Sequence, residues 1–250
     1  MIVIFPVCDR IKLLPYFLRY YSSLGADEFA CALYNGRKNP LFEEILSFRT
    51  QYNLHIDTSV ACCFESYRGA HEVKGLNVIR ETYASKARWY CIADLDEFHF
   101  FNGKNLMDIA SEAEQAGYEA VHGIFFDRIA ADGTFPEIQG SLDNTFPMVC
   151  DLSRCAGLAC RKITMAKGHV QITAGHHSVE ANIWRNVAQV HHFKWSAGVY
   201  EMMVDKYRRY KSQGLPWATH QLPRLLELIE NGVDLSNPKL NTREAARLGI

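Results

Sequence analysis

The chain has 250 residues, of which 48 % are hydrophobic and 22 % are charged, a balance typical of an ordinary globular protein. Its 27 Lys and Arg residues nearly cancel its 28 Asp and Glu residues, so neither a nucleic-acid partner nor a disordered acidic tail is expected. The apolar opening at residues 1–7 has no basic lead and falls far short of a membrane span, so it predicts a β-strand.

Strand-like and helix-like segments then alternate through the first hundred residues. Strands are predicted at 2–7, 28–34, 54–58 and 89–93, and apolar residues at helical spacing predict helices at 13–24, 41–46 and 76–87. Gly25 suits the end of the first helix, and Asn35-Gly36 suits a turn. This alternation is typical of a parallel sheet with helices packed on its faces.

The second half of the chain is less regular. Helices are predicted at 106–116, 199–211 and 221–231, and strands at 119–126, 163–165, 170–173 and 187–194. No internal repeat, low-complexity linker or clear domain boundary interrupts the sequence. We therefore expect a single α/β domain over residues 1–250, with a mixed sheet that is parallel in the N-terminal half and more antiparallel in the C-terminal half.

The eight cysteines lack the regular spacing of a disulfide framework, which predicts reduced thiols and a cytoplasmic protein. Cys150, Cys155 and Cys160 recur every five residues and precede three histidines, so a zinc site is the alternative. Structural zinc sites usually contain closer pairs such as C-x2-C, and we therefore prefer reduced thiols.

The stretch WYCIADLDEF at residues 89–98 leads from a strand into three carboxylates, Asp94, Asp96 and Glu97. Ligands of open parallel sheets bind beyond the carboxyl ends of the strands. If the chain stays extended here, Asp94 and Asp96 point the same way and repel each other unless a cation bridges them. Mg²⁺ or Mn²⁺ carrying a phosphorylated ligand satisfies this pattern. Glu97 could hold a nearby backbone group or a sugar hydroxyl, or could support the metal. The alternative is that one Asp caps the next turn and the others are solvated.

The stretch VHHFKW at residues 190–195 supplies the other groups that a metal–diphosphate site needs. On an extended segment His192 and Lys194 share one face, and His191 and Phe193 share the other. A neutral imidazole can complete a metal site, and an ammonium can neutralise a diphosphate. The alternative is a histidine pair that bonds backbone carbonyls.

Two further candidates follow strand-like runs. Gly175-His176-His177 could contact an acceptor or a leaving phosphate, or could form an exposed loop, and both interpretations stay open. Asp127-Arg128 ends the predicted strand at 119–126, where a salt bridge between neighbouring elements is the simpler interpretation and is preferred slightly.

Several of these blocks together resemble the family-2-like glycosyltransferases of the GT-A fold, most closely a bacterial group with a DxDEF core. The blocks are IVIFPVCDR, SLGADEF, LYNG, WYCIADLDEF, FFDRIAADG at 125–133, FP at 146–147, GHH at 175–177 and HHFKW, so the resemblance runs over most of the chain. It implies a GT-A (Rossmann-like) fold in which residues 1–104 bind a nucleotide-sugar and residues 105–250 form the acceptor side.

The resemblance also implies a cofactor, Mn²⁺ or Mg²⁺, and its ligands. Asp96 would bind the metal, and Asp94 would lie in the ribose or metal region. His192, or His191 in its place, would complete the coordination. Lys194 would meet the diphosphate.

The first strand would lie along the base and ribose of the donor, which is expected to be UDP- or GDP-linked, through Pro6, Val7, Cys8 and Asp9. Members of the group usually have Asn-Glu after this strand, whereas this chain has Asp9-Arg10. The base contacts are therefore expected to differ here.

The implied reaction is an inverting transfer of the sugar to an acceptor hydroxyl, in glycan or polysaccharide biosynthesis. The metal and Lys194 would stabilise the charge on the leaving diphosphate. A carboxylate must take the hydroxyl proton, and Asp127 is preferred because it should end a strand on the same rim as Asp94. The other candidates for this base are Asp151, Glu137 and Glu180.

Two other functions would use similar features. A sugar-phosphate nucleotidyltransferase would share the sheet and the metal, but such enzymes usually have a Gly-rich basic loop after the first strand, which residues 8–12 lack. A degenerate transferase kept as a binding module fits less well with the complete D-x-D, His and Lys set. The run KYRRYK at 206–211 could dock the protein on the inner face of the membrane, but a solvated helix face is preferred.

Overall fold

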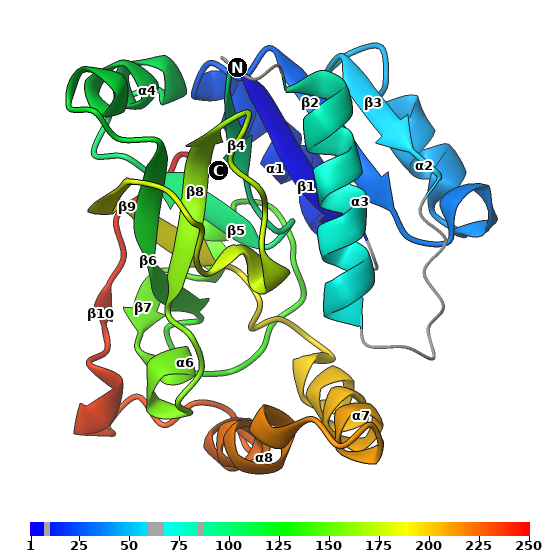
Figure 1. Cartoon of the computed structure of the whole chain (residues 1–250). Coiled ribbons are helices and arrows are strands. Elements are labelled where there is room, and N and C mark those ends of the chain that lie inside the picture. Colours follow the sequence, from blue (N-terminus) through cyan, green and yellow to red (C-terminus); the bar gives the residue numbers. More distant parts are fainter. Residues whose placement is uncertain (8–10, 60–67, 85–87) are drawn as a thin grey trace. The chain divides into compact units, whose positions relative to one another are not determined.

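The computed structural model describes residues 1–7, 11–59, 68–84 and 88–250, and Figure 1 shows its helices and strands. The chain forms two compact units. Unit 1 contains Met1–Ile124 and Arg161–Val190, and unit 2 contains Phe125–Cys160 and His191–Ile250. The division at residue 104 that the resemblance implies concerns function and stays a prediction.

Most strands belong to unit 1. Its elements are β1 (Ile2–Val7), η1 (Ile11–Leu13), α1 (Leu14–Ser23), β2 (Glu28–Leu33), η2 (Gly36–Lys38), α2 (Phe42–Ser47), β3 (Leu54–Asp57), α3 (Arg68–Tyr83), β4 (Trp89–Ile92), β5 (Glu97–Phe100), α4 (Leu106–Gln115), β8 (Arg161–Lys167) and η3 (Ala174–His176). Two strands contribute residues to both units, β6 (Ala120–Ile129) and β9 (Ile183–His192). The elements of unit 2 are α5 (Leu142–Thr145), β7 (Met148–Cys150), α6 (Leu152–Cys155), α7 (Val199–Ser212), α8 (Pro216–Ile229), η4 (Pro238–Leu240) and β10 (Arg243–Glu244).

The sheet of unit 1 is mixed. Its first four strands are parallel and lie in the order β3-β2-β1-β4. The strands β8 and β6 continue the sheet beyond β4, and each pairs antiparallel with its neighbour. The predicted α/β class, with a parallel first part and a more antiparallel second part, is confirmed.

Helices cover both faces of the parallel strands. Ile2 and Ile4 of β1 share a buried cluster with Leu76 and Ile79 of α3. Phe5 points to the other face, where its ring centroid lies 4.8 Å from that of Phe17 in α1. The two-residue period of a strand thus places α3 and α1 on opposite faces of the sheet, as Figure 1 shows.

The segment after β4 differs from the prediction. Residues 94–96 are not extended, because the chain turns at Leu95 and Asp96 and a new strand, β5, begins at Glu97. The backbone N–H of Glu97 donates to the carbonyl of Asp94 at 2.9 Å and closes this turn. The turn brings Glu97 back to Asp94, whose backbone N–H donates to the Glu97 Oε2 at 3.3 Å.

The prediction of a strand at 170–173 is also wrong, because the structure has no strand at these residues. The backbone N–H of Ile172 donates to the Oδ1 of Asn77 at 3.0 Å, and its carbonyl accepts from the Nδ2 of Asn77 at 2.8 Å. A side chain of α3 therefore satisfies the backbone groups that a neighbouring strand would otherwise bind. The apolar residues here pack without joining a ladder.

Unit 2 combines a short antiparallel ladder, β10-β7-β6, with the long helices α7 and α8. Its apolar core includes Trp195, Met203, Leu222 and Leu225. Both closing helices were predicted, although α8 starts at residue 216 rather than 221.

A buried ion pair fastens the last described residues to unit 2. The Nη2 of Arg128 donates to the Oδ1 of Asp143 at 2.9 Å, and neither side chain is more than 4 % exposed. The other Asp143 oxygen accepts the backbone N–H groups of Leu248 and Gly249 at 2.9 and 2.8 Å. Arg128 therefore forms the salt bridge that the sequence suggested, whereas its neighbour Asp127 has different partners.

The described cysteines are free thiols, as predicted; they are Cys31, Cys91, Cys150, Cys155 and Cys160. The Cys155 thiol donates to the carbonyl of Lys239, and the Cys160 thiol to that of Leu158. Within the described ranges, no metal-spaced group of side chains contains these cysteines, so the zinc alternative finds no support there. Cys8, Cys62 and Cys63 lie outside the described residues.

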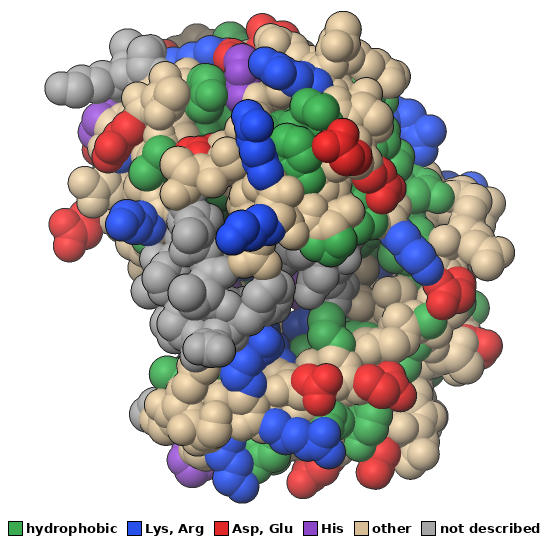
Figure 2. Space-filling model, turned by 90° about the vertical axis from the view of Figure 1, so that its right-hand side faces the viewer, with side chains coloured by type: hydrophobic (Ala, Val, Ile, Leu, Met, Phe, Trp, Pro, Cys, Tyr) green, Lys and Arg blue, Asp and Glu red, His purple; other side chains and the backbone are tan. Residues whose placement is uncertain are grey.

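Charged side chains of both signs are interspersed on the face drawn in Figure 2. This distribution agrees with the near-zero net charge of the whole sequence. None of the helices in the described part of the chain has the length and apolar content needed to cross a bilayer.

Candidate functional site

A cluster of charged side chains lies in unit 1, where the central strand β4 ends. The backbone N–H of Ala93 still donates to the carbonyl of Ile4 in β1 at 3.3 Å, so the chain stays in the sheet up to that point. Asp94 follows, and 29 % of its side chain is exposed. This position, beyond the carboxyl end of a parallel strand, is where open α/β sheets bind their ligands.

Lys162 is the centre of this cluster. It comes from β8, which runs antiparallel beside β4. Its Nζ lies 2.9 Å from the Oδ2 of Asp94 and 2.8 Å from the Oε1 of Glu97. Lys162 is only 6 % exposed and Glu97 only 1 %. This buried cation therefore pairs the carboxylates that lie next to the apolar interior.

His176 is the fourth member of the cluster. Its Nε2 lies 3.2 Å from the Nζ of Lys162 and 3.3 Å from the Oδ1 of Asp94. The Nδ1 of His176 is buried and has no hydrogen-bond partner within the described part of the chain. His176 has a left-handed backbone, with φ of 40°, directly after Gly175 at 63°. A Cβ on Gly175 would lie 2.8 Å from the ring of His177, so the glycine allows the turn that brings the imidazole inward.

The charges of the cluster hold one another in the ionised state. Burial alone would raise the pKa of Asp94, but the neighbouring Lys162 and His176 outweigh it and bring the pKa well below its usual range. Burial likewise acts to lower the pKa of Lys162, and the carboxylates of Asp94 and Glu97 reverse this and raise it. The cluster therefore keeps a buried ammonium beside the ionised carboxylate of Asp94.

Helix α1 supports the cluster from the other side of β5. The hydroxyl of Tyr21 donates to the carbonyl of Glu97 at 3.0 Å and accepts from the backbone N–H of His99 at 3.3 Å. Burial, followed by the neighbouring His176 and then Lys162, lowers the pKa of His99 well below its usual range. His99 is therefore a neutral, fully buried residue behind the charged side chains.

The cluster has the composition of a divalent-metal site. One oxygen each from Asp94 and Glu97 and one nitrogen from His176 all lie within 4.8 Å of one another. Two carboxylate oxygens and an imidazole nitrogen are ligands that Mn²⁺ accepts, so these residues could hold a metal ion. The ammonium of Lys162 contacts the same three side chains.

Asp127, the predicted base, is a buried hydrogen-bond acceptor in unit 2. It is 1 % exposed. Its Oδ2 accepts the backbone N–H of Ser153 at 2.7 Å, and its Oδ1 accepts the Ser153 hydroxyl and the Trp195 indole N–H at 2.8 and 2.9 Å. The Nδ1 of His192 lies 3.1 Å from the same Oδ1. Burial would raise the pKa of Asp127, but the bond and charge of His192, with the other donors, lower it.

In this geometry Asp127 holds the ring of His192, and its role as the base stays a prediction. A carboxylate with a low pKa and four hydrogen bonds is a weak base. A carboxylate that fixes one ring nitrogen is, by contrast, the usual support of a histidine that binds a metal through the other nitrogen.

The neighbours of His192 differ in environment. His191 is fully buried, and its Nδ1 lies 3.3 Å from the Nη1 of Arg128. Burial, followed by the charges of Arg128 and Arg243, lowers the pKa of His191 to about 3. A guanidinium repels a metal ion, which favours His192 over His191 as the ligand, and both stay predictions. Lys194 is half-buried, with its Nζ 5.4 Å from the centre of the Trp195 ring.

Of the residues predicted to contact the donor base, Pro6 and Val7 are buried in β1 and pair with Ala32 and Leu33 of β2. Their side chains belong to the packed sheet. Cys8 and Asp9 lie outside the described residues.

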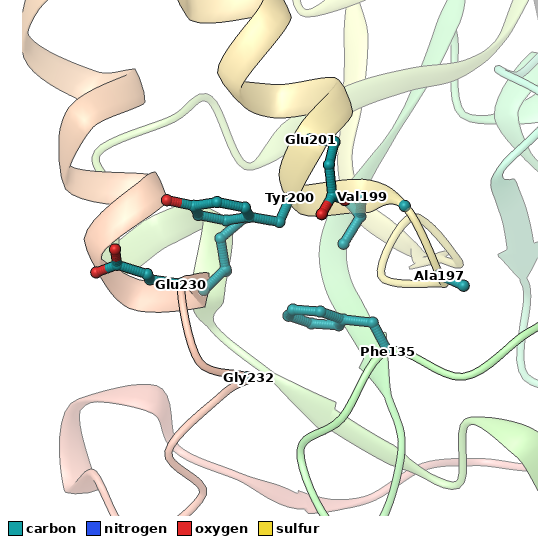
Figure 3. Close-up of a pocket in the computed structure, with 9 residues that line it drawn as sticks. Phe135, Ala197, Val199, Tyr200, Glu201, Glu230 and Gly232 are labelled. Carbon is teal, nitrogen blue, oxygen red and sulfur yellow. The ribbon is translucent and has the colours of Figure 1, made fainter.

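A pocket of about 350 Å³ lies in unit 2 where α7 begins. Figure 3 shows the ring of Phe135 facing Val199 and Tyr200, with the carboxylate of Glu201 directed toward the same space. Glu230, at the end of α8, forms the opposite side. The pocket thus combines aromatic rings with two carboxylates.

Lys162 and Glu97 are the main residues that sequence patterns underrated. Lys162 could have been recognised, because it is the only charged residue in KITMA, the part of β8 whose residues are all buried. Lys is rarely buried unless it is paired. His176 was predicted only as one of two open interpretations.

Comparisons with known proteins add little to these observations. No model of a known protein family matches the sequence, and no curated protein matches it. Among solved structures, the chain is similar to HddC from Yersinia pseudotuberculosis, with a TM-score of 0.39 and 8 % sequence identity over 82 % of this chain and 99 % of HddC. A likeness of this size supports no inference about activity, so the function must be argued from the site itself.

Proposed function

We propose that the protein transfers a sugar from a nucleotide-sugar donor to an acceptor hydroxyl. The observation that carries this proposal is the Asp94, Glu97, Lys162 and His176 cluster at the carboxyl end of β4. The Asp94 carboxylate in this cluster is partly exposed, and buried partners such as Lys162 hold it in place. A carboxylate placed in this way can accept hydrogen bonds from the hydroxyl groups of a donor ribose or sugar.

We retain a divalent cofactor, Mn²⁺ or Mg²⁺, in this proposal. Asp96 is the proposed carboxylate ligand and His192, whose ring Asp127 fixes, is the proposed imidazole ligand. A bound metal would supply positive charge to a departing diphosphate. Lys194 keeps its proposed role beside that diphosphate as a point charge.

The aromatic pocket of unit 2 is the proposed acceptor site. Sugar rings present C–H groups that pack on aromatic faces and hydroxyl groups that donate to carboxylates. Phe135 and Tyr200 provide the first kind of contact, and Glu201 and Glu230 the second. A volume of about 350 Å³ is large enough for one or two sugar rings.

The test is an activity assay over a panel of nucleotide sugars with Mn²⁺, in which release of the nucleoside diphosphate is measured. At least one donor should be cleaved, and Asp94→Asn should reduce kcat/KM at least a hundredfold. Asp205→Asn is the matched control, because Asp205 is exposed and pairs only loosely with Arg208 at 3.5 Å. Pyrophosphate release from a nucleoside triphosphate and a sugar phosphate would instead identify a nucleotidyltransferase and overturn the proposal.

A further inference from the structure

The ammonium of Lys162 has the contacts that a bound metal ion would have. Its Nζ lies 2.9 Å from Asp94, 2.8 Å from Glu97 and 3.2 Å from the Nε2 of His176. These are the three side chains whose ligand atoms lie within 4.8 Å of one another and could bind a divalent ion. An ammonium carries three N–H donors, one for each of these contacts.

A metal ion and this ammonium exclude each other. Both are cations, and both require the same oxygen and nitrogen lone pairs. Lys162 is anchored in β8 and 94 % of its side chain is buried, since its exposed fraction is 6 %. Moving the ammonium away to admit a metal would leave a buried charge without its partners, which is costly.

The contacts of His176 agree with an ammonium at the centre. The Nε2 of His176 lies 3.2 Å from the Nζ of Lys162 and 3.3 Å from the Oδ1 of Asp94. The Nδ1 is buried and has no hydrogen-bond partner among the described residues. The Nε2, the nitrogen that a metal would need, is therefore already engaged by Lys162 and Asp94.

We propose that Lys162 is the resident cation of the Asp94–Glu97–His176 group and that this group binds no divalent ion in the native protein. The chain thereby supplies its own positive charge where the D-x-D pattern predicts a metal. Asp94 is held ionised and oriented without any cofactor, and a divalent ion used in catalysis must bind through other ligands. The inference concerns this group alone and stands whether or not the proposed transfer is correct.

The first test uses proteins that should fold normally. Mn²⁺ binding to the wild type and to His176→Asn is measured by electron paramagnetic resonance, Asn being chosen because it tolerates the left-handed backbone at this position. The two proteins should bind Mn²⁺ with the same stoichiometry and with affinities that agree within twofold. A tenfold or greater loss of affinity in His176→Asn would overturn the inference, because it would place the metal on this imidazole.

The second test removes the resident cation. Lys162→Met replaces the side chain by a slightly shorter unbranched one without charge, so the vacated group should gain one Mn²⁺ site that the wild type lacks. Mn²⁺ should also raise the melting temperature of this variant more than that of the wild type, and Lys162→Met/His176→Asn should lose the new site. A folded Lys162→Met protein without an additional site would contradict the inference, and if the variant does not fold, the first comparison still decides.

These outcomes separate the inference from the proposed function. If the wild type binds no Mn²⁺ at all, the metal-dependent transfer fails and the assignment of Lys162 gains support. If the wild type binds Mn²⁺ and cleaves a donor but His176→Asn loses the metal, the assignment of Lys162 fails and the transfer stands.

Discussion

The Nζ of Lys162 lies 2.8 Å from the Oε1 of Glu97, and the two side chains are 6 % and 1 % exposed. A pair this deeply buried stabilises the fold little more than apolar residues would, but removing only one partner is strongly destabilising because it leaves the other charge unpaired. Lys162→Met should lower the free energy of unfolding by roughly 3–5 kcal/mol, because both carboxylates lose their counter-ion. Urea unfolding followed by circular dichroism measures this loss.

Lys104→Met is the matched control for that experiment. Lys104 lies 2.7 Å from Glu112, but the side chains are 48 % and 40 % exposed. Water already screens this pair, so its loss should change the free energy of unfolding by less than about 1 kcal/mol. Equal effects of the two substitutions would show that burial does not determine the role of Lys162.

Unfolding should also depend on pH through His191, whose folded pKa of about 3 lies below the unfolded value of about 6.5. The native state then binds fewer protons than the unfolded state. The contribution of His191 to the free energy of unfolding is fully present above about pH 6.5. It is lost as the pH falls toward 3, by at most about 1.4 kcal/mol per pH unit. His191→Gln should flatten the dependence between pH 6.5 and 4.5, a range above the titration of most carboxylates. Urea titrations in metal-free buffer test this, and an unchanged slope would argue against a buried neutral His191.

The Asp127–His192 pair predicts a graded effect on metal binding. Asp127→Asn should weaken Mn²⁺ binding about 10- to 100-fold, because the carboxylate no longer fixes the ring. Ser153→Ala removes one hydrogen bond to Asp127 and should have a smaller effect in the same direction. Calorimetric titration with Mn²⁺ gives both affinities. If Asp127→Asn abolished turnover and left Mn²⁺ affinity intact, Asp127 would be the base after all.

The pocket at α7 predicts a change in acceptor affinity alone. Phe135→Ala should raise the KM for the acceptor about tenfold, since the ring forms one wall of the pocket. Hydrolysis of the donor without acceptor should stay at the wild-type rate. An unaltered acceptor KM would show that the pocket does not bind the acceptor. A loss of activity in both assays would indicate that the substitution had disturbed the structure of unit 2.

Much of the fold could be predicted because its signals are local. Parallel strands were expected where short apolar runs alternate with helical patterns, and β1, β2, β3 and β4 appear there. The strand predicted at 170–173 failed for a reason that lies far away in the sequence. Asn77 binds the backbone of Ile172, and no pattern near either residue reveals that contact.

The part of the site that depends on local sequence signals could also be predicted. The position of Asp94 follows from the end of β4, which the sequence marks clearly. The partner of Asp94 does not, because Lys162 is 68 residues away on a strand whose register with β4 is set by packing. Periodicity also assumes an extended chain, so it paired Asp94 with Asp96, whereas the turn at Leu95 and Asp96 pairs it with Glu97.

The central claim is that the cluster at the end of β4 binds a nucleotide-sugar. Thermal unfolding of the wild type and of Asp94→Asn, over a panel of nucleoside diphosphates and nucleotide sugars with and without Mn²⁺, tests it most directly. At least one nucleotide sugar should raise the melting temperature of the wild type by mass action, and Asp94→Asn should lose that shift. A wild type that no nucleotide sugar stabilises, or a shift that Asp94→Asn keeps in full, would contradict the claim.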